Sequence, residues 1–316
     1  MLSLSMIVRN EEKCLGACLS SVRDFVDEMV VVDTGSTDST VAVAKAAGAR
    51  VEHFAWPGDF APVRNAALKF VRGDWVLVLD ADEQLRSSCI PQLLRFMSCD
   101  DALLVNLLRY EQGASMSPYS SVSRLFRRHP RICWARPYHS VVDESVWNIV
   151  KDENQWRIFD CEEPALIHLG YRPEFMQSGL KAQRLREAME SWLVDHPGDP
   201  YACAKLGALE VSEGSRDRGL KLIREGLLQV EGSHGSINEH YELLFHLGIA
   251  LASIDSEAAQ IAYREAIALP MNARANLGAL LNLASLLMKD GELEDAISLT
   301  VSATQLAPEV PLTWYN

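Results

Sequence analysis

The chain has 316 residues, of which 48% are hydrophobic and 23% are charged, a composition that excludes a disordered or fibrous protein. Its formal net charge of −13 argues against nucleic acid as a partner, because phosphate binding needs clustered Lys and Arg side chains. Chains of this length usually form more than one hydrophobic core, so we expect two domains.

The cysteines and the N-terminal segment bear on the compartment. None of the 7 cysteines shows the spacing of a zinc site or a Cys-x-x-Cys pair, which favours a reducing environment. The apolar run 1–8 is short and has no basic flank, so it is predicted to be a core strand instead of a signal peptide. No stretch approaches the roughly 18 uncharged residues of a membrane span. We therefore expect a cytoplasmic protein with no transmembrane segment.

Buried strands and helices are predicted to alternate in the first part of the chain. The apolar runs are 2–8, 29–32, 51–54 and 75–79, and the helical patterns between them are 11–25, a segment ending near residue 47, and 61–71. Continuous apolar strands joined by helices predict an α/β fold with a mostly parallel sheet, covered on both faces. Ligands of such sheets bind at the carboxyl ends of the strands. Two looser strands are predicted at 103–108 and 122–126.

The second half is predicted to be helical and repetitive. A long charged helix is expected at 174–193. Small residues then recur at an offset of 77 positions: Gly207, Gly219 and Gly226 correspond to Ala284, Ala296 and Ala303. Small residues at these positions let two helices approach closely, as in tetratricopeptide repeats, although other amphipathic hairpins show similar steps. The predicted boundaries are an α/β domain at 1–172, a connecting helix at 173–199 and a tetratricopeptide-like domain at 200–316.

The strongest local motif follows the strand 75–79. In an extended segment, Asp80 and Asp82 point to the same side and can converge on one hard cation. Magnesium or manganese prefers such oxygen ligands and completes its shell with water and phosphate oxygens. The alternative is that these acids only cap a helix that begins near Ser87.

Several motifs occur together in the first 85 positions. They lie at 6–12, 31–38, 56, 59–60, 64–67, 73–75 and 80–83. In these motifs the chain resembles the family-2 glycosyltransferases of the GT-A fold. More narrowly, it is similar to the subgroup with C-terminal tetratricopeptide repeats that includes the sublancin peptide S-glycosyltransferase.

The resemblance implies a nucleoside-diphosphate sugar as donor, UDP-linked, with Mg²⁺ or Mn²⁺ as cofactor. Asp33 is then expected at the nucleoside, and Asp80, Asp82 and His168 at the metal. The implied donor-binding residues are Val8, Asn10, Glu11, Asp33, Arg64, Asp80, Ala81 and Asp82. A guanidinium at Arg64 suits phosphate or ribose oxygens. The alternative is a surface arginine on a helix.

Later motifs match the family with one departure. The pattern Arg-x-Phe-Arg lies at 124–127, His139 follows, and His-x-Gly-Tyr lies at 168–171. Where the family has Glu after the first histidine, this chain has Ser140. Either Asp143 or Glu144 then acts as the base, or turnover is weak. His139 faces the metal or acceptor unless it is a packing histidine, and His168 could simply end a strand.

These observations predict a metal-dependent glycosyltransferase that acts with inversion on an acceptor the sequence does not identify: a peptide, a protein or a glycan. The repeats are expected to select the acceptor or to mediate self-association as a homodimer. The alternative is a non-catalytic module that binds a nucleotide sugar or interacts through its repeats, and Ser140 keeps this alternative open.

Overall fold

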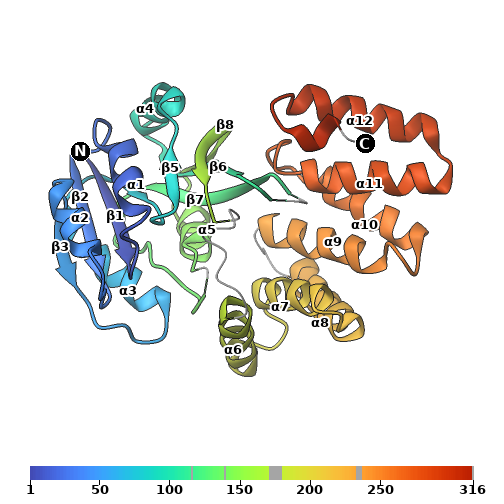
Figure 1. The fold of residues 1–316 in the computed structure, drawn as a ribbon, viewed down its shortest axis with the longest axis horizontal. Helices are drawn as coiled ribbons and strands as arrows, with labels where there is room; N and C mark the ends of the chain where they lie inside the picture. Colours follow the sequence, from blue (N-terminus) through green and yellow to red (C-terminus); the bar gives the residue numbers. More distant parts are fainter. Residues whose placement is uncertain (115–116, 139, 171–179, 233–236, 315–316) are drawn as a thin grey trace. The chain divides into compact units, whose positions relative to one another are not determined.

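The computed structural model describes residues 1–114, 117–138, 140–170, 180–232 and 237–314 (Figure 1). The chain divides into two compact units. One unit consists of Met1–Gly113 and Ser120–Phe175, and the other of Ala114–Tyr119 and Met176–Asn316. Each unit is described by itself.

The first part of the first unit is a parallel sheet with helical connections. Its strands are β1 (Leu2–Val8), β2 (Glu28–Asp33), β3 (Arg50–His53) and β4 (Trp75–Val78), joined through α1 (Leu15–Val22), α2 (Thr40–Ala46) and α3 (Phe60–Ala67). They pair in parallel in the order β3-β2-β1-β4. The predicted parallel α/β arrangement is therefore confirmed for these four strands.

Beyond β4 the sheet becomes mixed. The added strands are β5 (Glu83–Leu85), β6 (Ala102–Glu111), β7 (Tyr119–Arg127) and β8 (Arg157–His168), with η1 (Ser87–Cys89), α4 (Ile90–Ser98) and α5 (Asp143–Asp152) among them. The full order is β3-β2-β1-β4-β7-β6-β8-β5. β7 is antiparallel to β4, β5 is antiparallel to β8, and β6 is parallel to β8. This antiparallel part was not predicted.

Helices cover both faces of the sheet, which explains the uninterrupted apolar strands. Val31 of β2 packs in one buried cluster with Leu15 of α1, whereas Val30 and Val32 pack in a second cluster with Val63 of α3. Successive strand side chains point to opposite faces, so both faces need apolar residues.

The second unit is built of helices. They are α6 (Leu180–Asp195), α7 (Pro200–Ser212), α8 (Arg216–Gly232), α9 (Ile237–Leu251), α10 (Ser256–Ala268), α11 (Leu277–Asp290), α12 (Leu293–Leu306) and the short η2 (Pro311–Trp314). Consecutive helices from α7 onward pack in pairs (Figure 1). Of the helix predicted at 174–193, the part from 174 to 179 lies outside the described residues.

Glycines at helix contacts account for the repeat pattern. A Cβ added to Gly219 would lie 2.8 Å from the carbonyl oxygen of Gly207, and one added to Gly248 would lie 2.5 Å from the ring of Tyr263. The paired helices therefore approach too closely for larger side chains at these positions. The helical part fits the predicted tetratricopeptide repeats.

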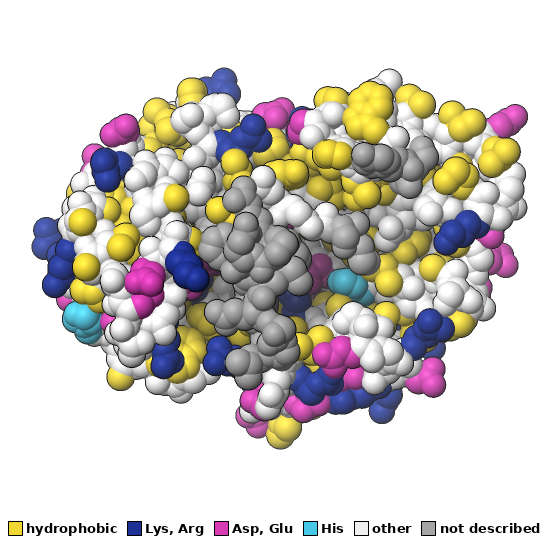
Figure 2. Space-filling view, viewed as in Figure 1, with side chains coloured by type: hydrophobic (Ala, Val, Ile, Leu, Met, Phe, Trp, Pro, Cys, Tyr) yellow, Lys and Arg dark blue, Asp and Glu magenta, His cyan; other side chains and the backbone are white. Residues whose placement is uncertain are grey.

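The charges on the surface and the length of the helices bear on two classes of partner, nucleic acids and membranes. On the face shown in Figure 2, Lys and Arg side chains are scattered among acidic ones. Within the described ranges, no helix combines the length and the apolar character needed to cross a membrane.

Candidate active site

The predicted site residues lie at one edge of the sheet. Val8 and Asp33 end β1 and β2 and are register partners, and Asp80 follows β4 by two residues. The carboxyl ends of parallel neighbours meet at the same edge, where α/β sheets bind their ligands.

Val8, Asn10 and Glu11 tie together the loops that follow β1 and β2. The carbonyl oxygen of Val8 accepts hydrogen bonds from both the amide and the hydroxyl of Thr34, at 3.0 Å each. Asn10, in the left-handed region at φ 59°, accepts from the amide of Thr37 at 2.8 Å. The Glu11 amide donates to the Thr40 hydroxyl at 2.7 Å. These residues thus hold the two loops together and form a rim at the carboxyl edge of the sheet. Their contacts with a donor stay a prediction.

Asp33 is fixed at the base of the same rim. Only 4% of Asp33 is exposed, and its carboxylate accepts the backbone amides of Gly35 at 3.1 Å and Ser36 at 3.2 Å. Gly35 has φ 102°, a conformation that favours glycine. The carboxylate of Asp33 also lies 3.4 Å from Nδ1 of His53. Its position therefore depends on the Asp-Thr-Gly-Ser sequence.

The Asp-x-Asp segment is a turn, so the expectation that it is extended is wrong. The amide of Glu83 donates to the carbonyl oxygen of Asp80 at 3.0 Å, and the Glu83 carboxylate accepts the Asp80 amide at 2.8 Å. The helix-cap alternative is also wrong, because η1 has Arg86 at its N-cap and no side-chain capping bond. A completely buried Glu83 closes the turn.

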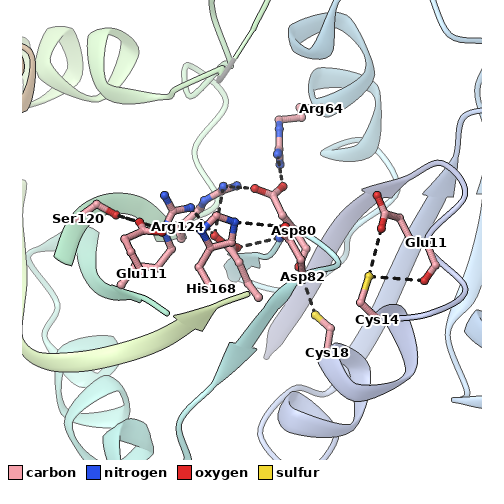
Figure 3. A network of polar contacts seen from close by, with 12 residues as sticks. Glu11, Cys14, Cys18, Arg64, Asp80, Asp82, Glu111, Ser120, Arg124 and His168 are labelled. Carbon is pink, nitrogen blue, oxygen red and sulfur yellow. Dashed lines mark hydrogen bonds and ion pairs between the residues drawn. The ribbon is translucent and has the colours of Figure 1, made fainter. Parts of the chain in front are cut away.

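Asp80 binds two arginines (Figure 3). The Nη2 atom of Arg64 lies 2.6 Å from one carboxylate oxygen, and that of Arg124 lies 2.5 Å from the other. Burial opposes ionisation of Asp80, but the two guanidinium charges outweigh it and hold its pKa well below the usual range. Arg64 is only 7% exposed and lies over the ring of Trp134, so the surface-arginine alternative is wrong.

Asp82 has a different partner. Its Oδ2 atom lies 3.2 Å from Nε2 of His168, whose Nδ1 lies 2.5 Å from Oε2 of Glu111. A Cβ on Gly170 would come within 2.5 Å of His168 Nε2, so the glycine of the His-x-Gly motif leaves room for this contact. Burial lowers the pKa of His168, but the hydrogen bonds to Asp82 and Glu111 outweigh it and raise the pKa to about 9.

The carboxylates of Asp80 and Asp82 thus have separate partners in this structure. Among the described residues, no group of three or more His, Cys, Asp and Glu side chains is arranged to hold a metal. Asp82 and His168 are the predicted ligands that lie side by side, and Asp80 is bound to arginines instead.

A buried charge network, only partly foreseen from the sequence, joins these groups. Arg109 binds Glu83 at 2.7 Å and Glu111 at 2.8 Å, and Arg124 lies 3.7 Å from Glu83. Sequence reasoning missed Arg109 and Glu111. Their signal was available: two charged residues, two positions apart, lie at the end of a largely apolar strand and therefore point to the same side.

The predicted base candidates differ in environment. Asp143 is the first residue of α5 and accepts a hydrogen bond from Ser123 at 2.9 Å, and burial raises its pKa. Its other carboxylate oxygen has no hydrogen-bond partner within the described part of the chain. Glu144 is exposed. Ser140 is buried, with no partner for its hydroxyl among the described residues. His139 lies outside them.

The strand β7 connects Asp143 with the Asp80 network, because Ser123, which binds Asp143, directly precedes Arg124, which binds Asp80.

The segment before α5 is held by hydrogen bonds from two elements. Asn65 bonds both the amide and the carbonyl of Trp134, at 2.8 and 2.9 Å. The hydroxyl of Ser145 does the same for Cys133, at 3.1 and 3.0 Å.

A mixed sheet with a parallel half and an acidic motif at its carboxyl edge is the architecture of a GT-A nucleotide-sugar domain. The sequence model described as "Glycosyl transferase family 2" matches residues 3–154. The chain is 41% identical over 307 residues to a TPR repeat-containing protein of Synechococcus elongatus, a match that covers 97% of this chain and 75% of that protein. The chain therefore belongs to glycosyl transferase family 2 and is a glycosyltransferase with tetratricopeptide repeats, as predicted.

More distant similarities extend the comparison. The SPbeta prophage-derived glycosyltransferase SunS of Bacillus subtilis is 26% identical over 207 residues, which cover 63% of this chain and slightly less than half, 46%, of that protein. Glucosyl-3-phosphoglycerate synthase from Mycobacterium tuberculosis, solved with Mg²⁺ and UDP, has a TM-score of 0.46 at 18% identity, covering 61% of this chain and 78% of that chain. TarS of S. aureus, solved with UDP-GlcNAc, has a TM-score of 0.46 at 16% identity, covering 92% of each chain.

Proposed function

We propose that this protein transfers a sugar from a UDP-sugar to an acceptor, with inversion and with a divalent cation bound by Asp82 and His168, in the cytoplasm. The observation that carries the proposal is the contact of Asp82 with His168 at the carboxyl edge, next to the arginine pair that holds Asp80.

The donor atoms of Asp82 and His168 fit a magnesium or manganese ion. Two adjacent ligands of an octahedral ion, each at about 2.1 Å, lie about 3.0 Å apart. The observed separation of Asp82 Oδ2 and His168 Nε2 is 3.2 Å. Such ions typically take one or two protein ligands and fill the remaining positions with water and phosphate oxygens. Two protein ligands are therefore sufficient.

The charge balance also favours a cation. The network contains four carboxylates, those of Asp80, Asp82, Glu83 and Glu111, and three guanidinium groups, those of Arg64, Arg109 and Arg124, so its charge is balanced only while His168 is protonated. A cation that replaces the proton on Nε2 of His168 keeps a positive charge between these carboxylates and a bound diphosphate. When bound, the ion would offset the negative charge that grows on the leaving diphosphate. Arg64 and Arg124 are placed to add guanidinium groups to the same phosphates.

Donor and acceptor then meet different parts of the chain. Asp33, at the end of β2, is suited to the nucleoside, beside the rim formed by Val8, Asn10 and Glu11. For the acceptor proton we propose Asp143, because burial raises its pKa and Ser123 fixes one of its oxygens. A positioned base of this kind contributes about 10² to 10⁴ in rate.

For the acceptor, only the chemical class is proposed, and the same repeats are the proposed surface for self-association. Stacked helical hairpins offer extended surfaces suited to peptides or protein segments. We therefore propose that the repeats select a peptide, protein or glycan acceptor or mediate self-association as a homodimer.

The substitution Asp82→Asn tests the metal assignment, because it keeps the size of the side chain and removes its charge. We expect kcat to fall by about 10² or more, roughly 3 kcal/mol of transition-state stabilisation. UDP release is measured with a panel of UDP-sugars and Mn²⁺, with the exposed Asp100→Asn as the matched control.

Full metal-stimulated turnover in Asp82→Asn, or wild-type turnover that is unchanged in excess chelator, would show that the metal assignment is wrong. Donor binding by the wild type, detected as a thermal shift but without any turnover, would support the non-catalytic alternative.

A further inference from the structure

Glu111 is the residue that connects His168 to the rest of the buried network (Figure 3). It ends β6, and His168 ends the neighbouring parallel strand β8, so the two are register partners. Only 4% of Glu111 is exposed, and its carboxylate lies against the imidazole.

The two oxygens of Glu111 have separate partners. Oε1 accepts hydrogen bonds from Nε of Arg109 at 2.8 Å and from the hydroxyl of Ser120. Oε2 is left to face Nδ1 of His168 at 2.5 Å. Arg109 and Ser120 therefore fix the direction in which Oε2 points, and the carboxylate cannot turn away from the ring without breaking both bonds.

This geometry decides which ring nitrogen is available for a metal. The Glu111 carboxylate accepts hydrogen bonds from Arg109 and Ser120, so it is also the acceptor in its contact with His168, and Nδ1 is the donor. Nε2 is the nitrogen that faces Asp82.

We propose that Glu111 is a positioning residue that holds the His168 ring through Nδ1 and thereby presents Nε2, together with Asp82, to the divalent cation. The inference rests on the proposed function, because it specifies how that metal site is built. Carboxylates that accept from the second nitrogen of a metal-bound histidine fix its ring orientation and raise its basicity. Their loss typically weakens metal binding by about 10- to 100-fold.

The test measures metal binding directly. Mn²⁺ is titrated into the full-length protein with UDP present, and free Mn²⁺ is followed by electron paramagnetic resonance. We expect Glu111→Gln to bind Mn²⁺ about 10- to 100-fold more weakly than the wild type. Glu111→Asp keeps the charge on a shorter side chain and should recover part of the affinity. Glu162→Gln, an exposed change on β8, is the matched control and should bind as the wild type does.

A spectroscopic readout separates positioning from general destabilisation. Pulsed electron paramagnetic resonance of bound Mn²⁺ should show coupling to an imidazole nitrogen in the wild type and in Glu162→Gln, and reduced coupling in Glu111→Gln. Unchanged affinity and coupling in Glu111→Gln would overturn the role of Glu111 alone. If Glu111→Gln fails to fold, Glu111→Asp is measured in its place, and wild-type affinity and coupling in that variant would overturn the requirement for this carboxylate geometry. If the wild type binds no Mn²⁺ with UDP, the metal-dependent function itself fails.

Discussion

Removing the charge of Glu83 should destabilise the first unit, because Glu83 is the buried centre of the network. Its side chain is 0% exposed, binds Arg109 at 2.7 Å, lies 3.7 Å from Arg124 and accepts the Asp80 amide at 2.8 Å. Glu83→Gln keeps the shape of the side chain and an acceptor for the Asp80 amide. It removes the charge that faces the two arginines.

The expected loss follows from what remains. Deleting one partner of a buried ion pair costs about 3 to 5 kcal/mol when the other charge is left alone. Here Arg109 keeps Glu111 and Arg124 keeps Asp80, so we expect a smaller loss of about 2 to 3 kcal/mol. For a unit of this size, that loss lowers Tm by about 4 to 12 °C.

The assay is calorimetric unfolding of the full chain, in which the two units can give separate transitions. The control is Asp152→Asn, which breaks an ion pair with Arg131 whose side chains are 58% and 44% exposed. An exposed pair is worth at most about 1 kcal/mol. If Glu83→Gln loses no more than Asp152→Asn, the buried charges do not stabilise the turn and the reasoning fails.

Three further predictions concern the segment around α5. Asp143→Asn should slow transfer by about 10² to 10⁴ at unchanged donor affinity, whereas Glu144→Gln should have little effect, and equal kinetics in the two variants would point to a base elsewhere. Burial raises the pKa of Asp143, so ionisation of this carboxyl group opposes folding once the pH exceeds its pKa in the unfolded chain. Relative to the wild type, Asp143→Asn should therefore gain more in Tm at about pH 7 than at about pH 4. A Tm difference between the two proteins that does not depend on pH would contradict this. Asn65→Ala leaves the amide and carbonyl of Trp134 without this partner and should cost about 2 to 4 kcal/mol in urea unfolding, an expectation that a loss below about 1 kcal/mol would refute.

The parallel half of the sheet could be predicted because each of its strands shows itself in a short run of neighbouring residues. Val30, Val31 and Val32 are apolar in succession, and only a strand covered on both faces requires that. The position of Asp33 at the end of this strand, directly after the apolar run 29–32, follows from the same pattern. The paired helices were predictable for a similar reason, since contacts as close as that of Gly207 with Gly219 restrict the residue type.

The rest depends on contacts between distant parts of the chain. Whether 80–83 is extended or turned depends on Glu83, whose charge is tolerated inside because Arg109 of β6 and Arg124 of β7 lie against it. The pairing of Glu111 with His168 depends on the register of β6 against β8, which includes bulges that no periodicity reveals. The sequence therefore gave Asp80 and Asp82 the wrong geometry, and their roles in a site stay a prediction.

The separate partners of the two aspartates give each of them a distinct place in the proposed function. Arg64 and Arg124 are nearly buried, and two guanidinium groups on one carboxylate would repel each other without it. Asp80 thus allows two cations to be held ready at the edge where a diphosphate is proposed to bind, and Asp82 stays available beside His168. Because the arginines are already desolvated and fixed, they need little reorganisation when phosphate charge develops, which is the condition under which electrostatic stabilisation is most effective. In the proposed function, an acid that orients arginines and an acid that binds the metal would therefore stabilise the same leaving group from two sides.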